Sequence, residues 1–118
     1  MDAHVLFAGV AVTDFERAHA WYGRFFGRPA DVVAHATEEM WRVTDGGWLY
    51  VVRDPDHAGS GLVAVAVADL DADVAALRDR GITPGPITLE GPAARKCAVS
   101  DPDGNTLALL EAPGESGG

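Results

Sequence analysis

The chain has 118 residues, one cysteine and a formal charge of -9, from 18 acidic and 9 basic side chains. This length suits one domain with an ordinary hydrophobic core, and a single cysteine permits no intrachain disulfide. The acidic balance argues against nucleic acid and anionic membranes as partners, while it favours solubility and cationic ligands. The first residues lack the pattern of a secretory leader, and no segment reaches transmembrane length, so a cytoplasmic location is expected.

The first half of the chain predicts a strand, a helix and three further strands. Residues 5–12 are apolar and strand-like, and Thr13 with Glu16 three residues later has the pattern of a capping box at a helix start. Gly27 and Pro29 are expected to end that helix. Strands are then predicted at 32–35, 41–44 and 48–53. The helix carries an apolar stripe made of Phe15, Ala18, Tyr22, Phe25 and Phe26.

The second half predicts the same order of elements. A strand at 62–68 leads to Asp69, which is expected to cap a helix that buries Leu70, Val74 and Leu77 and ends at Gly81. Strands follow at 87–90, 96–100 and 106–110, with an Asp-Pro-Asp-Gly turn between the last two. The predicted organisation is a first module at 1–54, a linker at 55–61, a second module at 62–112 and a flexible tail at 113–118.

A repeated phrase supports this division into two similar halves. Residues 10–15 read VAVTDF and residues 65–70 read VAVADL, which is a shift of 55 positions. Each copy predicts a strand that runs into a helix cap. Asp-Gly-Gly at 45–47 and Asp-Gly-Asn at 103–105 likewise each precede an apolar strand. The chain is therefore predicted to use one βαβββ motif twice.

Two such halves, the Thr13-Asp14, Trp21-Tyr22 and Phe26-Gly27 pairs of the first helix, and the closing segment DPDGNTL at 101–107 resemble the vicinal oxygen chelate superfamily. This group includes glyoxalase I, fosfomycin resistance enzymes, extradiol dioxygenases and bleomycin resistance proteins. The resemblance implies an α+β fold in which eight strands form an open cup with the helices outside. It also implies a homodimer with small-molecule sites near the dimer interface.

The resemblance further implies where the enzymes of this superfamily hold a divalent metal, on the first and last strands of each half. In this chain those positions are Phe7, Tyr50, Leu62 and Ala108. The repeat makes Phe7 and Leu62 equivalent without reference to any family, because they too are 55 residues apart. Only Tyr50 carries a donor atom, and one phenol does not make a metal site. We therefore expect no metal and no other cofactor.

Strand alternation predicts which side chains face the cup. Phe7, Tyr50 and Trp48 share this face, and small residues beside them leave room for a ligand. Trp41 is expected to add to the aromatic wall, and Lys96 to contact an anionic or carbonyl group. A core role for the aromatics and a solubility role for Lys96 are the alternatives. The candidate ligand-binding residues are Phe7, Trp41, Trp48, Tyr50, Leu62, Lys96 and Ala108.

The remaining reactive side chains form no recognisable motif. His4, His19, His35 and His57 have no metal-ligand spacing, and Cys97 has no neighbour that would activate its thiol, so it is expected to be buried.

These observations favour a metal-independent protein that sequesters a cationic or aromatic small molecule, such as an antibiotic or natural product, in the manner of bleomycin resistance proteins. One alternative is an enzyme of the same superfamily that uses Tyr50, Lys96 or His35 for acid-base chemistry in a lyase, isomerase or dioxygenase-like site. No convergent acid-base pair supports it, so the chain is not expected to be an enzyme. The other alternative is a dimeric interaction module.

Overall fold

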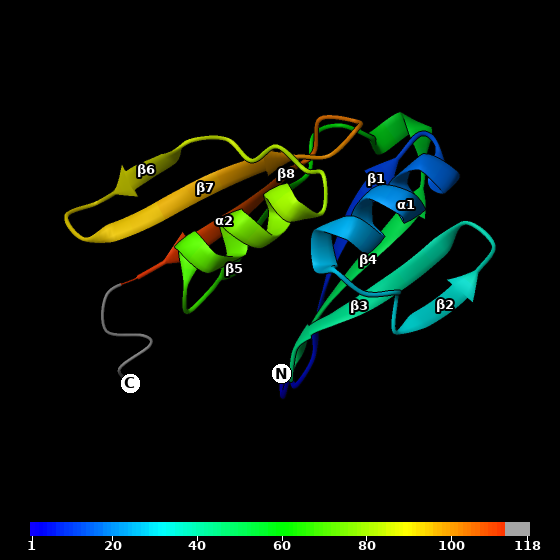
Figure 1. The fold of residues 1–118 in the computed structure, drawn as a ribbon. Helices are drawn as coiled ribbons and strands as arrows, with labels where there is room; N and C mark the ends of the chain where they lie inside the picture. The colour runs from blue at the N-terminus through cyan, green and yellow to red at the C-terminus, as the bar shows by residue number, and fades with distance from the viewer. Residues whose placement is uncertain (113–118) are drawn as a thin grey trace.

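Two four-stranded mixed sheets, each with one helix packed on it, make up the part of the chain that the computed structural model describes, residues 1–112 (Figure 1). The predicted flexible tail at 113–118 lies outside the described residues. The first module contains β1 (Leu6–Val12), α1 (Phe15–Phe26), β2 (Val32–His35), β3 (Glu38–Thr44) and β4 (Gly47–Arg53). After a short 3-10 turn, η1 (Pro55–His57), the second module contains β5 (Leu62–Ala66), α2 (Leu70–Asp79), β6 (Ile87–Glu90), β7 (Ala94–Ser100) and β8 (Thr106–Glu111).

The two sheets have the same topology, which confirms the prediction of a motif used twice. Their strand orders are β1-β4-β3-β2 and β5-β8-β7-β6, and in each sheet only the first pair is parallel. Gly9 lies opposite Tyr50 in the first sheet, and Ala64 lies opposite Ala108 in the second. Because Gly9 and Ala64 are 55 residues apart, the register makes Tyr50 and Ala108 equivalent. The α+β class and the βαβββ modules are thus confirmed, with the eight strands divided between two sheets.

The start of α1 differs from the prediction by one residue. The cap is Asp14, whose carboxylate accepts a hydrogen bond from the Arg17 N–H at 3.1 Å, and not Thr13. The Thr13 hydroxyl instead donates to Asp103 at 2.6 Å, in the other module. Asp69 caps α2 as predicted, through the Ala72 N–H. Three strands also differ by two or three residues at one end, since β5 is shorter than expected and β3 and β7 begin earlier, and three others differ by one residue.

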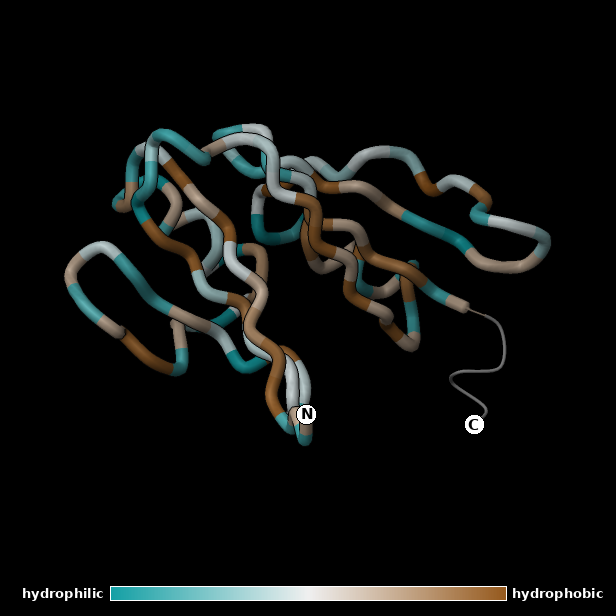
Figure 2. Tube along the Cα trace, turned by 180° about the vertical axis from the view of Figure 1, so that it is seen from behind, coloured by the Kyte–Doolittle hydropathy of each residue, from teal (hydrophilic) through white to brown (hydrophobic). Residues whose placement is uncertain are grey.

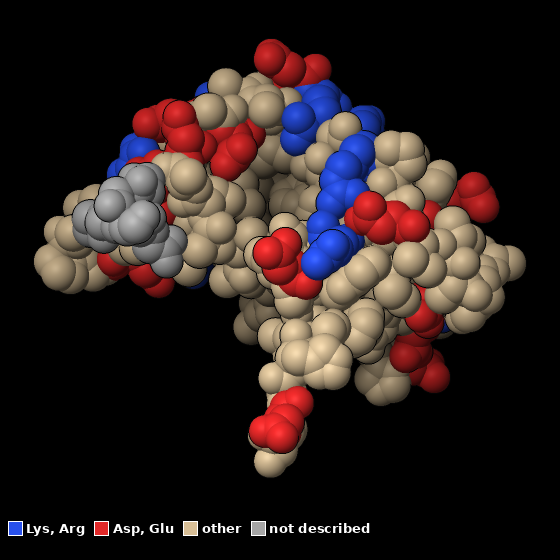
Figure 3. Space-filling view, turned by 90° about the horizontal axis from the view of Figure 1, so that it is seen from below, with Lys and Arg blue, Asp and Glu red and all other residues tan. Residues whose placement is uncertain are grey.

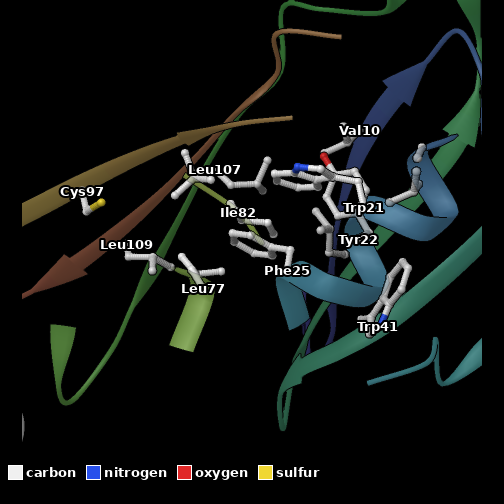
Figure 4. Packing of buried hydrophobic residues seen from close by; sticks show 14 of the residues in the cluster. Val10, Trp21, Tyr22, Phe25, Trp41, Leu77, Ile82, Cys97, Leu107 and Leu109 are labelled. Carbon is white, nitrogen blue, oxygen red and sulfur yellow. The ribbon is translucent and has the colours of Figure 1, made fainter. Parts of the chain in front are cut away.

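One hydrophobic core joins the two modules. Side chains of α1 reach across to Leu107, Ile82 and Leu77 of the second module, with Trp21 and Phe25 stacked at a centroid distance of 5.2 Å (Figure 4). Trp21 is absent from the predicted stripe, although it is buried and stacks on Phe25, which belongs to the stripe. The core therefore holds the two halves together as well as filling each of them.

A buried polar cluster also connects the modules. The Tyr22 hydroxyl donates to Asp101 at 2.7 Å, and Asp101 accepts further bonds from the backbone N–H groups of Asp103 and Asn105. The Asn105 amide donates to the Ala11 carbonyl at 2.8 Å and accepts from the N–H groups of Gly59 and Gly61. Burial, followed by the neighbouring Asp101 carboxylate, raises the pKa of Tyr22 far above its usual value, so the phenol stays neutral.

The first turn of α2 is held by an ion-pair network from β7 and β8. Glu111 accepts the Leu70 N–H at 2.7 Å, and Arg95 bridges Glu111 and Asp71 at 2.9 and 3.0 Å. The hydrogen bond from Leu70, and then that from Arg95, lowers the pKa of Glu111 below its usual 4.5. A carboxylate with a depressed pKa stabilises the fold above its unfolded-state pKa, and this contribution is lost as the pH falls through its folded-state value.

Glu111→Gln is therefore expected to make the Tm depend less on pH under acidic conditions. Thermal unfolding followed by circular dichroism from about pH 6 to about pH 3.5 should show a smaller loss of Tm for the variant than for the wild type. Gln can still accept the Leu70 N–H, so the geometry of the helix start is kept. Glu16→Gln on α1 is the matched control. An equal loss of Tm over this pH range in the wild type and in Glu111→Gln would contradict this role of Glu111.

Within residues 1–112, no helix covers the face of each sheet that is opposite its own helix. Both helices lie in front of the sheets in Figure 1, and the strands lie in front of the helices when the molecule is seen from behind in Figure 2. The uncovered faces carry exposed Phe7 and Leu62, whereas Val10, Val12 and Val51 on the helix side are buried.

Neither α1 nor α2 has the length and apolar character that a membrane-spanning helix requires.

Candidate functional site

The uncovered face of the first sheet brings together an aromatic group. Phe7 on β1 and Trp48 on β4 are register partners, and their rings stack at a centroid distance of 6.1 Å with an interplanar angle of 29°. Tyr50 lies two residues further along β4, and Met40 is its partner on β3. Leu49 and Val51, between these positions, point into the core. Strand alternation thus places the side chains of Phe7, Trp48, Tyr50 and Met40 on one face, as predicted for the first three.

An open cavity of about 630 Å³ lies against this aromatic group. Its floor is Phe7, Trp48 and Met40, and residues 1–5 form its side wall. The only ionisable side chains among its lining residues are Asp2 and His4, and both belong to the N-terminal segment. Most of the lining is apolar, which suits a ligand that presents a flat hydrophobic surface.

Tyr50 is positioned by the absence of a side chain opposite it. Its ring lies directly over Gly9, so closely that a Cβ atom at Gly9 would overlap the Cζ, Oη and Cε2 atoms of the ring. The equivalent pair in the second sheet is Ala64 and Ala108, where neither residue is large. A glycine opposite an aromatic residue lets the ring cover the bare backbone. Gly9 therefore fixes where the phenol of Tyr50 lies on the uncovered face.

Gly9→Ala is expected to displace the Tyr50 ring from β1. In NMR spectra of the free protein, the Gly9 Hα signals should show strong ring-current shifts that disappear in Tyr50→Leu, and the Tyr50 ring signals should move in Gly9→Ala. Ala64→Val at the equivalent place in the second sheet faces no ring and is the control. Unchanged Tyr50 signals in Gly9→Ala would show that the ring does not depend on this contact.

Trp41 does not belong to this face, and the prediction that it adds to the aromatic wall is wrong. The residue is fully buried on the helix side of β3, where its ring stacks on Phe26 at 5.1 Å and its indole N–H donates to the Arg28 carbonyl at 3.0 Å. Met40, the neighbouring residue, faces the cavity instead. Assigning Trp41 to the cup placed Met40 on the opposite side, so the sequence reasoning missed Met40.

The second sheet carries the other predicted residues, and the cavity at Phe7 does not include them. Leu62 on β5 is 84% exposed, while Ala108 on β8 is almost fully buried. Lys96 on β7 lies 3.7 Å from Glu90 and is partly exposed. Cys97 and Val99 point into the core, as predicted. The structure therefore places Phe7 and Trp48 in the cavity and Tyr50 on the same face but outside the cavity lining, and it leaves Leu62, Lys96 and Ala108 on the second sheet.

A family model described as the Glyoxalase/Bleomycin resistance protein/Dioxygenase superfamily matches residues 3–109. The chain belongs to this superfamily. Among solved structures, it is similar to a glyoxalase/bleomycin resistance protein from Catenulispora acidiphila, with 38% identity and a TM-score of 0.87 over 92% of this chain and 98% of that one. None of the curated proteins matches the chain significantly.

Two other superfamily structures differ in what their names describe. An antibiotic binding protein from Streptomyces sp. CB03234 has 28% identity and a TM-score of 0.75, over 95% of this chain and 98% of that one. A lactoylglutathione lyase from Agrobacterium tumefaciens has a TM-score of 0.75 over 94% of this chain and 95% of that one, but only 15% identity. The second likeness shows the shared fold alone.

The positions at which enzymes of the glyoxalase superfamily would hold a metal do not suit one in this member. Phe7, Leu62 and Ala108 have hydrocarbon side chains, and Tyr50 offers a single phenol oxygen. Divalent metals in proteins are held by several His, Cys or carboxylate ligands. Within residues 1–112, no three such side chains converge on a common point. A metal reaction at these four positions therefore has no ligand set.

The reactive side chains of this superfamily member occur as separate structural contacts. His19 bonds Glu39 at 2.8 Å, His57 bonds Asp54 at 2.8 Å, and His35 lies 3.5 Å from Glu38. The Cys97 thiol is buried against the Gly85 carbonyl, and burial raises its pKa. His35 is on the edge strand β2, Tyr50 is two strands away, and Lys96 is in the other sheet. The structure does not bring these three candidate acid-base groups together.

Proposed function

We propose that this protein binds a planar, apolar or aromatic small molecule on the Phe7, Trp48 and Tyr50 face and holds it without chemical change. The observation that carries the proposal is the stacked Phe7 and Trp48 pair on the floor of a mostly apolar cavity of about 630 Å³. A bound ring system would cover aromatic area that is otherwise exposed to water. The Tyr50 phenol, on the same face but outside the cavity lining, would supply a polar contact to a ligand that extends beyond the cavity.

Sequestration of an antibiotic or natural product is the activity that we propose for this binding. Similarity to an antibiotic binding protein, at 28% identity over nearly all of both chains, supports this reading. The net charge of -9 would attract a cationic compound over a distance. Binding would be independent of metal, because the four positions that a metal would need carry one donor side chain among them.

We further propose that the protein forms a homodimer and that the partner subunit closes the open side of the cavity. The uncovered faces of both sheets carry exposed apolar residues, including Phe7 at 52% and Leu62 at 84% exposure. Apolar area of this kind marks an interaction surface. The cup would then consist of one sheet from each protomer, with its ligand near the interface.

Ligand binding can be tested by thermal-shift screening of protein treated with a chelator. Tetracycline represents aromatic polyketides, and bleomycin represents cationic glycopeptides. A ligand at a hundred times its Kd should stabilise the protein by about 2.7 kcal/mol, equally before and after Zn²⁺ or Mn²⁺ is added back. Stabilisation that requires added metal would contradict metal-independent binding. Turnover of the bound compound, followed by mass spectrometry, would favour the enzyme alternative.

A further inference from the structure

A second space runs between the two modules, alongside the end of α1. It consists of two adjoining cavities of about 300 and 240 Å³. One reaches outward to Arg80 and Asp73 near α2, and the other reaches inward to Ala8 and Leu107. We call this space the intermodule channel. Six residues line both of its cavities, namely Phe25, Phe26, Val43, Thr44, Val65 and Ala66.

The walls of the intermodule channel are hydrocarbon and aromatic side chains. Among the described residues that line its inner cavity, Thr44 and Trp48 are the two with a polar side-chain group. Phe26, Val43 and Val65 pack against the core but remain partly uncovered. A mostly apolar channel with few polar partners holds water poorly, and an elongated apolar group would fill it more favourably. The channel therefore suits an aliphatic chain better than a polar ligand.

The outer end of the channel is cationic on one side. Arg80 extends from the end of α2 across the end of α1, where its guanidinium donates to the backbone carbonyls of Arg24 and Phe25. Gly27 makes this crossing possible, because a Cβ atom there would lie 3.1 Å from the Arg80 Cζ. The α1 carbonyls, which would otherwise repel an anion, are thus already bonded to a cation.

Beyond Arg80 lies a third cavity of about 430 Å³, which is lined by Arg24, Arg28 and Arg80 and by no acidic residue. Arg28 is paired with Asp31, whereas the Arg24 side chain has no ion-pair partner among residues 1–112. Figure 3 shows a band of Lys and Arg side chains beside the hollow on this face. Asp73 lines the channel on the α2 side, so an anionic group would be drawn toward Arg24 and away from α2.

We infer that the intermodule channel binds a long-chain carboxylate, with its aliphatic tail between Phe26, Val43 and Val65 and its carboxylate at Arg24 and Arg80. Tail and head each have a complementary surface, and Arg80 lies at the boundary between the two. Guanidinium groups pair with carboxylates in a charge-assisted manner. The site shares only Trp48 with the cavity at Phe7, and its remaining lining comes from α1, β1, β3, β4 and the second module, so it is tested separately from the function proposed above.

Calorimetric titration of the full chain with decanoate tests this site. The wild type should bind one decanoate per chain. Val65→Phe places a ring in the part that both cavities share and should weaken binding by about tenfold or more. Val33→Phe, the same change at an exposed position on β2, should leave binding unchanged. Val43→Phe fills the channel from β3 and gives a second blocked variant if Val65→Phe does not fold by circular dichroism.

The head group is tested by comparing decanoate with decanol. Arg24→Gln should weaken decanoate by about fivefold and leave decanol unchanged, while Arg78→Gln on the exposed side of α2 should affect neither ligand. The inference would be overturned if the wild type shows no saturable binding of decanoate. It would also be overturned if binding persists in folded Val65→Phe and Val43→Phe. Equal losses for decanoate and decanol in Arg24→Gln would overturn the placement of the head. A change of oligomeric state in Val65→Phe, measured by light scattering, would mean that a second copy of the chain occupies the channel, and would also overturn it.

Discussion

Trp48→Ala is expected to weaken binding of any ligand found for the aromatic face by about thirtyfold to a hundredfold, while the Tm changes little. Trp48 is partly exposed and supplies half of the stacked floor of the cavity. A large aromatic residue at the centre of a binding surface is worth about 2–3 kcal/mol when it is truncated. Because the indole contributes little to the core, folding should tolerate its loss. Titrations followed by calorimetry and unfolding in urea measure the two effects separately.

Trp41→Ala is the matched variant, because it removes the same side chain from the other face of the sheet. Trp41 is fully buried and stacks on Phe26, so its truncation should cost about 3–5 kcal/mol of unfolding free energy. Any Trp41→Ala protein that remains folded should keep its ligand affinity. A weakened ligand affinity in folded Trp41→Ala, or a large loss of stability in Trp48→Ala, would reverse the assignment of the two faces.

Asn105→Ala is expected to lower the unfolding free energy by about 3–4 kcal/mol, because it leaves several buried partners without hydrogen bonds. The amide of Asn105 bonds the backbone of Gly59, Gly61 and Ala11, and it also contacts Asp101. These partners lie in the first module, the linker and the second module. Urea unfolding monitored by circular dichroism gives the change in free energy directly.

Tyr22→Phe provides a graded comparison within the same cluster. It removes one hydrogen bond to Asp101, and Asp101 keeps its bonds to Asn105 and to the turn backbone. The expected loss is about 1.5–3 kcal/mol, the range for a hydrogen bond to a charged group. A loss below about 1 kcal/mol in Asn105→Ala, or a larger loss in Tyr22→Phe than in Asn105→Ala, would mean that the cluster does not hold the modules together.

Most of the fold could be predicted because its two halves repeat. The shift of 55 residues relates β1 to β5 and the cap of α1 to the cap of α2, and strict alternation then assigned the faces of Phe7, Tyr50 and Cys97 correctly. Local pattern thus sufficed wherever a strand had a clear apolar phase. The superfamily resemblance, which rests on the same elements, is confirmed over residues 3–109.

The errors have physical reasons that lie outside the local sequence. The sequence of β3 does not decide which of its side chains face the cup, because Met40 and Arg42, on either side of Trp41, could also lie there. The stacking of Trp41 on Phe26 decides it. Thr13 and Asp14 are both good cap residues. Asp103, 90 positions away, takes the Thr13 hydroxyl and leaves the cap to Asp14. The channel between the modules depends on how the halves meet, which no single segment encodes.

One difference between the two halves lies in the turn before the last strand of each. The turn between β3 and β4 has two residues, 45–46, whereas the turn between β7 and β8 has five, 101–105. The longer turn contains Asp101, Asp103 and Asn105, all of which bond residues of the first module. A duplicated motif with identical halves could associate equally well with a half from another chain, as in domain swapping. The extra residues give the second half a contact that the first half lacks, and so they make the order of the two halves within one chain distinguishable.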